Sequence, residues 1–279
     1  MDEKPRNIIV IGAPRSGTSL TTAIFARKGY YVGPIEEDGV RTGDEHNPFG
    51  YFEADDVIAQ NVGLFRKVGY PEHNTWLERP ISDEEISAIA RLPPSAEDRQ
   101  FLASYASREP WVWKDPRLTL TLGYWWKLMD PETTGVVFAA RDEGDIFNSF
   151  LRMGWYQNDG PSRSEALRRI RQHLKAAREA IAGLQIPHIT IDYWEYLEKP
   201  EDVAQRLGKF CRLRLSAEDL NVRRDLAHTS AKGRLSAWLR RQVDGGVLQA
   251  LRHLKPLVPR AVLHWAFPEK KYVPPKRGQ

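Results

Sequence analysis

Three basic residues stand where the chain could bind and act on an anion. Arg15, Lys114 and Arg141 each lie at or shortly after the end of an apolar run that predicts a buried strand. These runs cover residues 8–11, 111–113 and 134–140. The carboxyl ends of parallel strands meet at one edge of a sheet, which would bring the three cations together. Because unpaired buried cations are costly, the pattern favours a polyanionic ligand over separate pairing of each cation with a neighbouring acid.

The stretch around Arg15, GAPRSGTS over residues 12–19, has the composition of an anion-binding turn. Its glycines bound a turn between a predicted strand and a predicted helix, so backbone N–H groups and the helix dipole would face a negative group. The spacing is close to the nucleotide-binding loop G-x-x-x-x-G-K-[ST], but Thr18 stands where that loop has lysine. The stretch therefore predicts a site for phosphate-like groups that differs from a standard ATP loop.

The acids beside two of these cations are better interpreted as helix caps than as catalytic groups. Asp115 and Asp142 directly follow Lys114 and Arg141 and begin the next helical patterns, where a cap contributes about 1 kcal/mol. The strand at 134–140 leads into arginine rather than into a Walker B aspartate, so the usual Mg-ATP apparatus is not indicated. The sequence has no His/Cys spacing typical of zinc sites, and no metal is expected.

The elements that must position these residues alternate between strand and helix. This alternation predicts an α/β fold, a doubly wound parallel sheet of the P-loop type with about five strands and flanking helices. The two further predicted strands cover residues 30–32 and 187–192. Predicted helices cover residues 17–28, 53–68, 82–92, 116–129, 162–184, 200–210, 235–243 and 247–254, and two more begin at residues 95 and 142.

Two of the predicted helical regions have a further interpretation. The helices that begin near Ser82 and Ser95 are expected to form a helical lobe away from the sheet. The helix at 162–184 has an apolar stripe that ends at Leu184, and its other side is interpreted as a solvated basic face. The basic residues of that face are Arg163, Arg168, Arg169, Arg171, Lys175 and Arg178.

Composition is that of an ordinary soluble protein. The 279-residue chain is 41% hydrophobic and 28% charged, and its formal net charge of +4 suits a small anionic ligand better than nucleic acid. We expect one domain over residues 1–279, with a core at about 7–215, a helical C-terminal extension at about 216–268 and a frayed tail at 269–279.

The single cysteine and the absence of long apolar runs indicate a compartment. Cys211 lies in an apolar helical pattern, which predicts a core residue and excludes an internal disulfide. No signal-like segment and no run of roughly 18 apolar residues is present, so no membrane span is expected. These features predict a cytoplasmic protein, and the choice between a monomer and a homodimer stays open.

Four motifs occur in a fixed order: GAPRSGTS, WKDPR, FAARDEGDIFNSF and IDYWEYLEKP. Over residues 7–210 their order and spacing resemble the sulfotransferases that use 3'-phosphoadenosine-5'-phosphosulfate (PAPS). The resemblance is closest to the bacterial and tyrosylprotein-type branch, which has PRSGT rather than PKSGT in its loop. It implies in-line transfer of the sulfuryl group of PAPS, without a metal, to a hydroxyl of a glycan, a lipid or a small metabolite.

The resemblance also implies a role for each motif residue. The 5'-phosphosulfate would be held by Arg15, Ser16, Gly17, Thr18 and Ser19. The 3'-phosphate would be bound by Arg141, Ser149 and Tyr193. Lys114 would reach the transferred sulfuryl group and, with Arg15, stabilise charge on the leaving oxygen. The basic loop that closes over the nucleotide in this family is matched only poorly, by Ser230, Lys232 and Gly233.

The acceptor hydroxyl needs a general base, and the resemblance points to a glutamate. Glu53 ranks first because related bacterial sequences resemble the run NPFGYFE at 47–53, and Glu36 ranks second because its distance from Arg15 matches the glutamate branch. The alternative for Glu53 is that it only opens the helix that follows. Trp76, Trp155 and Tyr156 are either stacking platforms for an acceptor ring or core residues.

Two other functions compete with sulfuryl transfer. A P-loop small-molecule kinase would need Mg-ATP, against which the missing loop lysine argues. A non-catalytic nucleotide-binding module would keep Arg15 and Arg141 but would lack a base beside the sulfate. Binding of 3',5'-adenosine bisphosphate compared with Mg-ATP discriminates among these functions.

Overall fold

The computed structural model of the chain describes residues 4–35, 47, 50–71, 76, 79–153 and 162–222. Its strands are β1 (Asn7–Ile11), β2 (Val112–Lys114), β3 (Thr134–Ala140) and β4 (His188–Asp192). Its helices are α1 (Thr18–Arg27), α2 (Asp55–Lys67), α3 (Asp83–Arg91), α4 (Ala96–Ala106), α5 (Leu118–Trp125), α6 (Glu143–Arg152), α7 (Arg163–Gly183), α8 (Glu195–Glu198), α9 (Pro200–Cys211) and α10 (Ala217–Leu220), with a 3₁₀ turn at Trp126–Leu128. The predicted helices at 235–243 and 247–254 lie outside the described residues.

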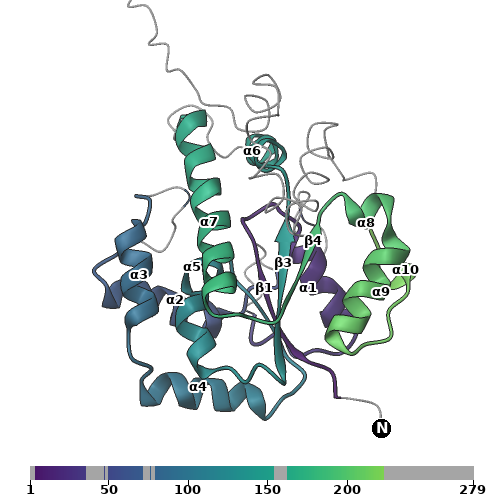
Figure 1. Cartoon of the computed structure of the whole chain (residues 1–279), viewed down its shortest axis with the longest axis horizontal. Helices are drawn as coiled ribbons and strands as arrows, with labels where there is room; N and C mark the ends of the chain where they lie inside the picture. The colour runs from purple at the N-terminus through teal and green to yellow at the C-terminus, as the bar shows by residue number, and fades with distance from the viewer. Residues whose placement is uncertain are drawn as a thin grey trace, which may run out of the picture. The chain divides into compact units, whose positions relative to one another are not determined.

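The strands form one parallel sheet in the order β2-β1-β3-β4 (Figure 1). β1 pairs with β2, where Val10 lies opposite Lys114, and with β3 along its whole length. β4 pairs with the outer side of β3, where Asp192 lies opposite Ala140. The carboxyl ends of the strands therefore lie along one edge, as the doubly wound prediction requires.

The predicted strand at 30–32 is wrong, and the described sheet has four strands rather than about five. Tyr31 makes only an isolated parallel bridge to Trp111. The chain cannot extend this bridge into a ladder because Gly29 and Gly33 on either side have φ of 85° and 105°, outside the extended region. Tyr31 therefore adds a single bridged residue to the edge of the sheet beside β2.

Apolar side chains on both faces of the sheet bring helices to both sides. Successive strand residues point to opposite faces, and Ile9 packs in a core with α2 to α7 whereas Ile8 packs in a second core with α1 and α8 to α10. Figure 1 shows α5 and α7 on one side of the strands and α1 and α9 on the other. Cys211 lies in the second core, where burial raises the pKa of its thiol, so its prediction as a core residue is confirmed.

The helices α3 and α4 do not stand away from the sheet as expected. Both begin at capping boxes, on Ser82 and Ser95, but they contribute Ile89 and Tyr105 to the core that covers the sheet. The ring of Tyr105 meets Trp113 of β2 edge-on at 5.2 Å between centroids. The two helices are therefore part of the layer on that face.

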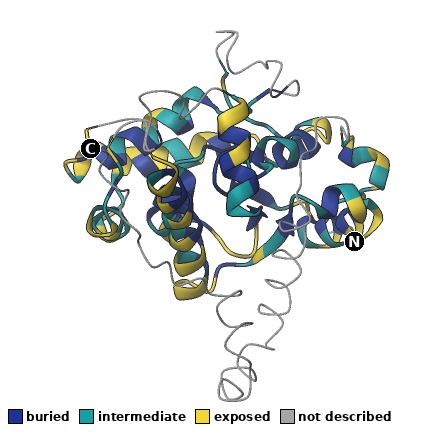
Figure 2. Cartoon of the chain, turned by 90° about the horizontal axis from the view of Figure 1, so that it is seen from above, coloured by how far each residue is buried: buried dark blue, intermediate teal, exposed yellow. Residues whose placement is uncertain are grey.

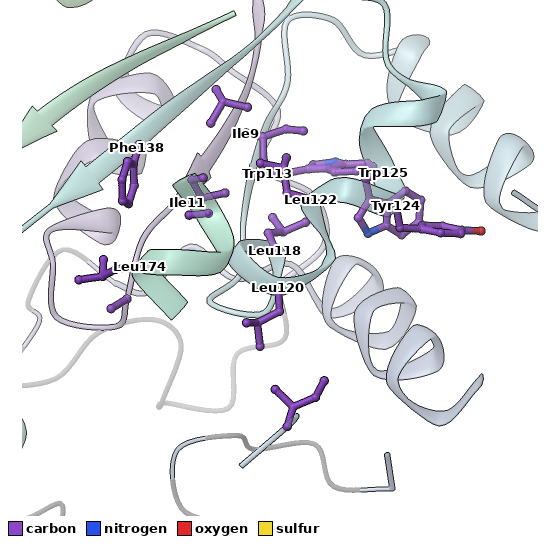
Figure 3. Close-up of a cluster of buried hydrophobic side chains, with 14 of the residues drawn as sticks. Ile9, Ile11, Trp113, Leu118, Leu120, Leu122, Tyr124, Trp125, Phe138 and Leu174 are labelled. Carbon is purple, nitrogen blue, oxygen red and sulfur yellow. The ribbon is translucent and has the colours of Figure 1, made fainter. Parts of the chain in front are cut away.

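Aromatic rings fill the core beside β2. Trp113 and Trp125 are buried and meet edge-on at 5.4 Å between centroids. Figure 3 shows them with Leu118 and Leu122 of α5 beneath the sheet. This packing fixes α5, the helix that follows Lys114, against the strand that precedes it.

Trp76 also belongs to the core, so of its two interpretations the core residue is confirmed and the stacking platform is excluded. Its side chain is 4% exposed, and its ring lies 5.3 Å from Phe150 of α6 and 4.2 Å from His173 of α7. The sequence placed Trp76 in a loop, but this loop residue packs inward between two helices. Trp155 and Tyr156, the other two candidates, lie outside the described residues.

The basic face of α7 is solvated as predicted, with one exception. Arg168, Arg171 and Lys175 are exposed and paired with Glu165, Glu143 and Asp83. Arg169 is buried instead, because its guanidinium donates to the Trp76 carbonyl at 2.8 Å and to Glu165 at 3.0 Å. The stripe also ends before Leu184, which is 42% exposed.

Figure 2 shows the buried and exposed sides of the flanking helices. Although α7 has 21 residues, neither it nor any other helix in the described ranges is long and apolar enough to cross a membrane.

His173 makes the stability of the fold depend on pH. It is 1% exposed, and burial, together with the charge of Arg169, lowers its pKa to about 3. In the unfolded chain its pKa is about 6.5, so between about pH 6.5 and 3 the unfolded state binds a proton that the folded state does not. Stability therefore falls as the pH falls, by about 1 kcal/mol from His173 between pH 7 and 5.5.

Urea unfolding at a series of pH values checks this prediction. His173→Phe should flatten the dependence between about pH 7 and 5.5. Equal slopes for the wild type and His173→Phe would contradict a neutral buried imidazole.

Candidate functional site

The turn between β1 and α1 lies where the order of the sheet reverses. From β1 the chain passes first to β2 on one side and then to β3 on the other. Such switch points are the usual ligand sites of doubly wound sheets. Lys114 ends β2 on one side of the turn, and Arg141 and Tyr193 follow β3 and β4 on the other side. The structure thus brings the predicted residues to one edge.

Two glycines let the turn approach its neighbours closely. Gly12 has φ of 148°, and a Cβ there would lie 2.5 Å from the carbonyl oxygen of Ala139. Gly17 has φ of 103°, and a Cβ there would lie 2.8 Å from Cδ2 of Tyr193. Arg15 between them has φ of 68°, a left-handed conformation that is uncommon for a residue with a side chain. The turn therefore packs directly against β3 and against the ring of Tyr193.

Thr119 of α5 holds the other side of the turn. Its hydroxyl accepts from the Gly12 N–H and donates to the Gly12 carbonyl, both at 3.1 Å. Thr119 was missed from the sequence because a buried threonine in an apolar helix carries no signal of such a contact. It fixes the start of the turn to the helix that follows Lys114.

The start of α1 is suited to an anion. Thr18 and Ser19 form its first residues, its N-cap Gly17 provides no side-chain cap, and its first turn holds no acid. The first N–H groups of a helix have no partner within the helix. The buried hydroxyl of Ser16 also has no hydrogen-bond partner among the described residues. An anion placed here would meet unsatisfied donors and the positive end of the helix dipole.

A cluster of four side chains lies beside the turn. Nε of Arg15 donates to the Ser149 hydroxyl at 3.1 Å, and Arg141 donates to the Arg15 carbonyl at 2.9 Å. The Arg141 guanidinium stacks on the Tyr193 ring at 4.2 Å from its centroid. Arg141 is 8% exposed, and burial lowers its pKa, an effect that Tyr193 and Asp145 oppose and the charge of Arg15 reinforces. Two adjacent cations, one of them buried, favour a polyanion beside them.

Lys114 and Glu53 form an ion pair on the other side of the turn. The ammonium of Lys114 donates to Oε1 of Glu53, and the two side chains are 3% and 18% exposed. The backbone reaches Glu53 through left-handed residues at Gly50 and Phe52, with φ of 87° and 55°. The Tyr51 ring lies 5.9 Å from Nζ of Lys114. A carboxylate beside a buried ammonium can accept a proton next to a site where negative charge is stabilised.

The acids that directly follow Lys114 and Arg141 in the chain, Asp115 and Asp142, have different structural roles. Asp142 caps α6, accepting from the N–H groups of Gly144 and Asp145 at 2.9 and 3.2 Å, so its predicted role is confirmed. Asp115 was predicted to cap a helix starting at residue 116, but α5 starts at Leu118 with Arg117 as its N-cap.

The partner of Asp115 is Arg117, at 2.8 Å, and not Lys114. Asp115 also accepts from the Arg117 N–H at 3.1 Å, which makes a turn before the helix. Burial lowers the pKa of Arg117, but the charges of Asp115 and Glu53 outweigh this effect and raise it. Because Asp115 pairs with Arg117, the ion-pair partner of Lys114 is Glu53.

Asn61 was also missed, although the sequence carried a signal for it. It is fully buried in α2 and donates to Asp115 at 2.9 Å. Helical spacing from the apolar residues Val57 and Leu64 puts position 61 on the buried side, where a polar residue needs a partner.

Several predicted residues lie outside the part of the chain that the structure describes. These are Glu36, Ser230, Lys232 and Gly233. In the described ranges no group of three or more His, Cys, Asp or Glu side chains is arranged to hold a metal ion.

Solved structures with a similar fold include two sulfotransferase domains. One is the sulfotransferase domain of the olefin synthase from Synechococcus PCC 7002, with 15% identity over 79% of this chain and 78% of that chain and a TM-score of 0.44. The other is the sulfotransferase domain from the curacin biosynthetic pathway, with 16% identity over 81% of both chains and a TM-score of 0.44. No curated protein sequence matches the chain significantly.

The family model described as "Sulfotransferase family" matches residues 5–217. The match contains β1, the turn between β1 and α1, Lys114, Arg141, β4 and Tyr193. It covers well over half of the 279 residues. The chain therefore belongs to the sulfotransferase family.

Proposed function

We propose that this sulfotransferase moves the sulfuryl group of PAPS to a hydroxyl of a glycan, a lipid or a small metabolite. The observation that carries the proposal is the arrangement of groups along one edge of the sheet. An anion-binding turn lies between the Arg15–Ser149–Arg141–Tyr193 cluster and the Lys114–Glu53 pair. PAPS has negative groups at both ends of its ribose, which suits a turn with a second cationic site beside it.

The residues present fit this donor. The open start of α1 and the unsatisfied Ser16 hydroxyl would receive the 5'-phosphosulfate, together with Arg15, Gly17, Thr18 and Ser19. Arg141 and Ser149 would receive the 3'-phosphate, and Tyr193 would hold the Arg141 guanidinium in place by stacking.

Transfer would take place between the turn and the ion pair. Bound PAPS supplies an activated sulfuryl group on a phosphate leaving group. Lys114 would stabilise charge on the sulfuryl and leaving oxygens, with Arg15 and the backbone N–H groups of the turn. Glu53 would accept the proton of the acceptor hydroxyl.

The first prediction concerns the donor site. At about 100-fold over its dissociation constant, 3',5'-adenosine bisphosphate should raise the melting temperature by about 5 °C or more, whereas Mg-ATP should not. Arg141→Gln should abolish most of this shift, since it removes the buried cation. Arg152→Gln, at an exposed arginine at the end of α6, should retain it. Stabilisation by Mg-ATP alone would instead support the kinase.

The second prediction concerns the ion pair. Lys114→Ala and Glu53→Gln should each lower the rate of labelled sulfate transfer by about 10²-fold or more, because they remove charge stabilisation and the base. The assay uses a panel of glycan, lipid and small-metabolite alcohols as acceptors. Slow transfer of labelled sulfate to water measures activity when no acceptor is added.

Lys127→Ala is the control for the ion pair, since Lys127 is exposed and donates to the Leu92 carbonyl at 2.9 Å. Unchanged transfer in Lys114→Ala would remove Lys114 from the mechanism. Binding of 3',5'-adenosine bisphosphate without any transfer by the wild type would support the non-catalytic module.

The third prediction concerns the fit between the turn and Tyr193. Gly17→Ala should lower the free energy of unfolding by about 1–2 kcal/mol more than Gly29→Ala, and should weaken 3',5'-adenosine bisphosphate binding. Both glycines have positive φ, but a Cβ on Gly29 meets nothing within 4 Å whereas one on Gly17 meets Tyr193. Urea unfolding measures the free energy of unfolding of each variant. Equal decreases in the two variants would show that the Tyr193 side chain moves aside without an energetic cost.

A further inference from the structure

One buried amide joins the two segments that carry the Lys114–Glu53 pair. Asn61 lies in α2, and its Nδ2 donates to Oδ2 of Asp115 at 2.9 Å. Glu53 stands two residues before the same helix and pairs with Lys114. Lys114 and Asp115 are neighbours in the chain, so two consecutive residues at the end of β2 are both held by the α2 segment.

The orientation of this amide is fixed by its other contacts. Oδ1 of Asn61 accepts from the indole N–H of Trp125 at 2.9 Å and from the Thr121 hydroxyl at 2.7 Å. An indole nitrogen can only donate, so the oxygen must face Trp125 and the nitrogen must face Asp115. Since Asn61 is fully buried, no water competes with these bonds.

The bond to Asp115 differs in kind from the other contacts of that carboxylate. Asp115 also accepts from the backbone N–H and the guanidinium of Arg117, only two residues away. Those bonds shape the local turn but cannot fix it relative to α2. The bond from Asn61 is the contact of Asp115 that spans the two segments.

We propose that Asn61 is a positioning residue that keeps the carboxylate of Glu53 on the ammonium of Lys114. It does so by fixing α2 against the Lys114–Asp115 turn, and it touches neither donor nor acceptor. The inference rests on the proposed function in assigning catalytic roles to Lys114 and Glu53, but the placement of Asn61 is independent of it.

The variant Asn61→Asp tests the donor specifically. It keeps the size of the side chain and the acceptor for Trp125 and Thr121, but it puts an oxygen where Asn61 donates to Asp115. Two facing buried carboxylates repel one another unless they share a proton, and at high pH the bond from position 61 is lost although Arg117 still pairs with Asp115. The rate kcat should therefore fall at least about tenfold near pH 8, with KM for PAPS within twofold.

The pH profile provides the readout that a loss of stability would not move. Toward about pH 6 the shared proton restores a donor between the two carboxyls, so part of the lost kcat should return. Thr121→Val is the matched control, since it removes one bond to Asn61 on the other side of the amide. Its kcat should stay within about twofold of the wild type, with no new pH dependence.

A second measurement needs no sulfate transfer at all. Lys114 is 3% exposed and paired, so its acylation, followed by mass spectrometry, should be slow compared with that of the exposed Lys127. Asn61→Asp should raise the rate at Lys114 by at least about fivefold relative to Lys127, and Thr121→Val should not. Equal effects of both variants, or no effect of Asn61→Asp, would overturn the proposal. A wild type that transfers no sulfate would instead refute the proposed function and leave this measurement decisive.

Discussion

The ion pair between Lys114 and Glu53 is the interaction on which the arrangement of the site depends. Lys114 ends the edge strand β2, but its side chain is buried, and an unpaired ammonium there would be costly. Its partner comes from the segment before α2, far away in the sequence, so burial of the charge fixes α2 against β2. Asn61 and Asp115 repeat the connection two helical turns further along. The apolar packing of α2 and α5 on the same face of the sheet completes the link.

On the opposite side of the turn, the charged side chains are arranged differently. Arg141 donates to the Arg15 carbonyl and stacks on Tyr193, and the charges of Asp145 and Arg15 act on it in opposite directions. Like charges held together in a buried place are a cost that a bound anion would relieve. The two sides thus differ in composition, since a lysine pairs with a glutamate on one side whereas two arginines lie together on the other.

Much of the fold was predictable where local pattern decides structure. The continuous apolar runs gave β1 and β3 almost to the residue, and the cap residues Ser82 and Asp142 marked helix starts. Failures occurred where tertiary packing decides, since nothing local shows that Trp76 and Arg169 are buried against each other. The pairing of Glu53 with Lys114 could not be derived from spacing, because the two residues belong to elements joined only in the fold. Their roles, like those of Arg15 and Arg141, stay predictions.

The close contacts of Gly12 have a consequence for the thermodynamics of ligand binding. Its backbone lies against Ala139 of β3, and both its N–H and its carbonyl are bonded to Thr119. The start of the turn is therefore as rigid as the sheet and α5 on which it rests. A ligand bound there need not order the backbone, so it avoids an entropic cost that a flexible loop would impose on each residue it immobilises. The entropic cost of ordering this part of the turn is met during folding, when the glycine backbone is packed between a strand and a helix.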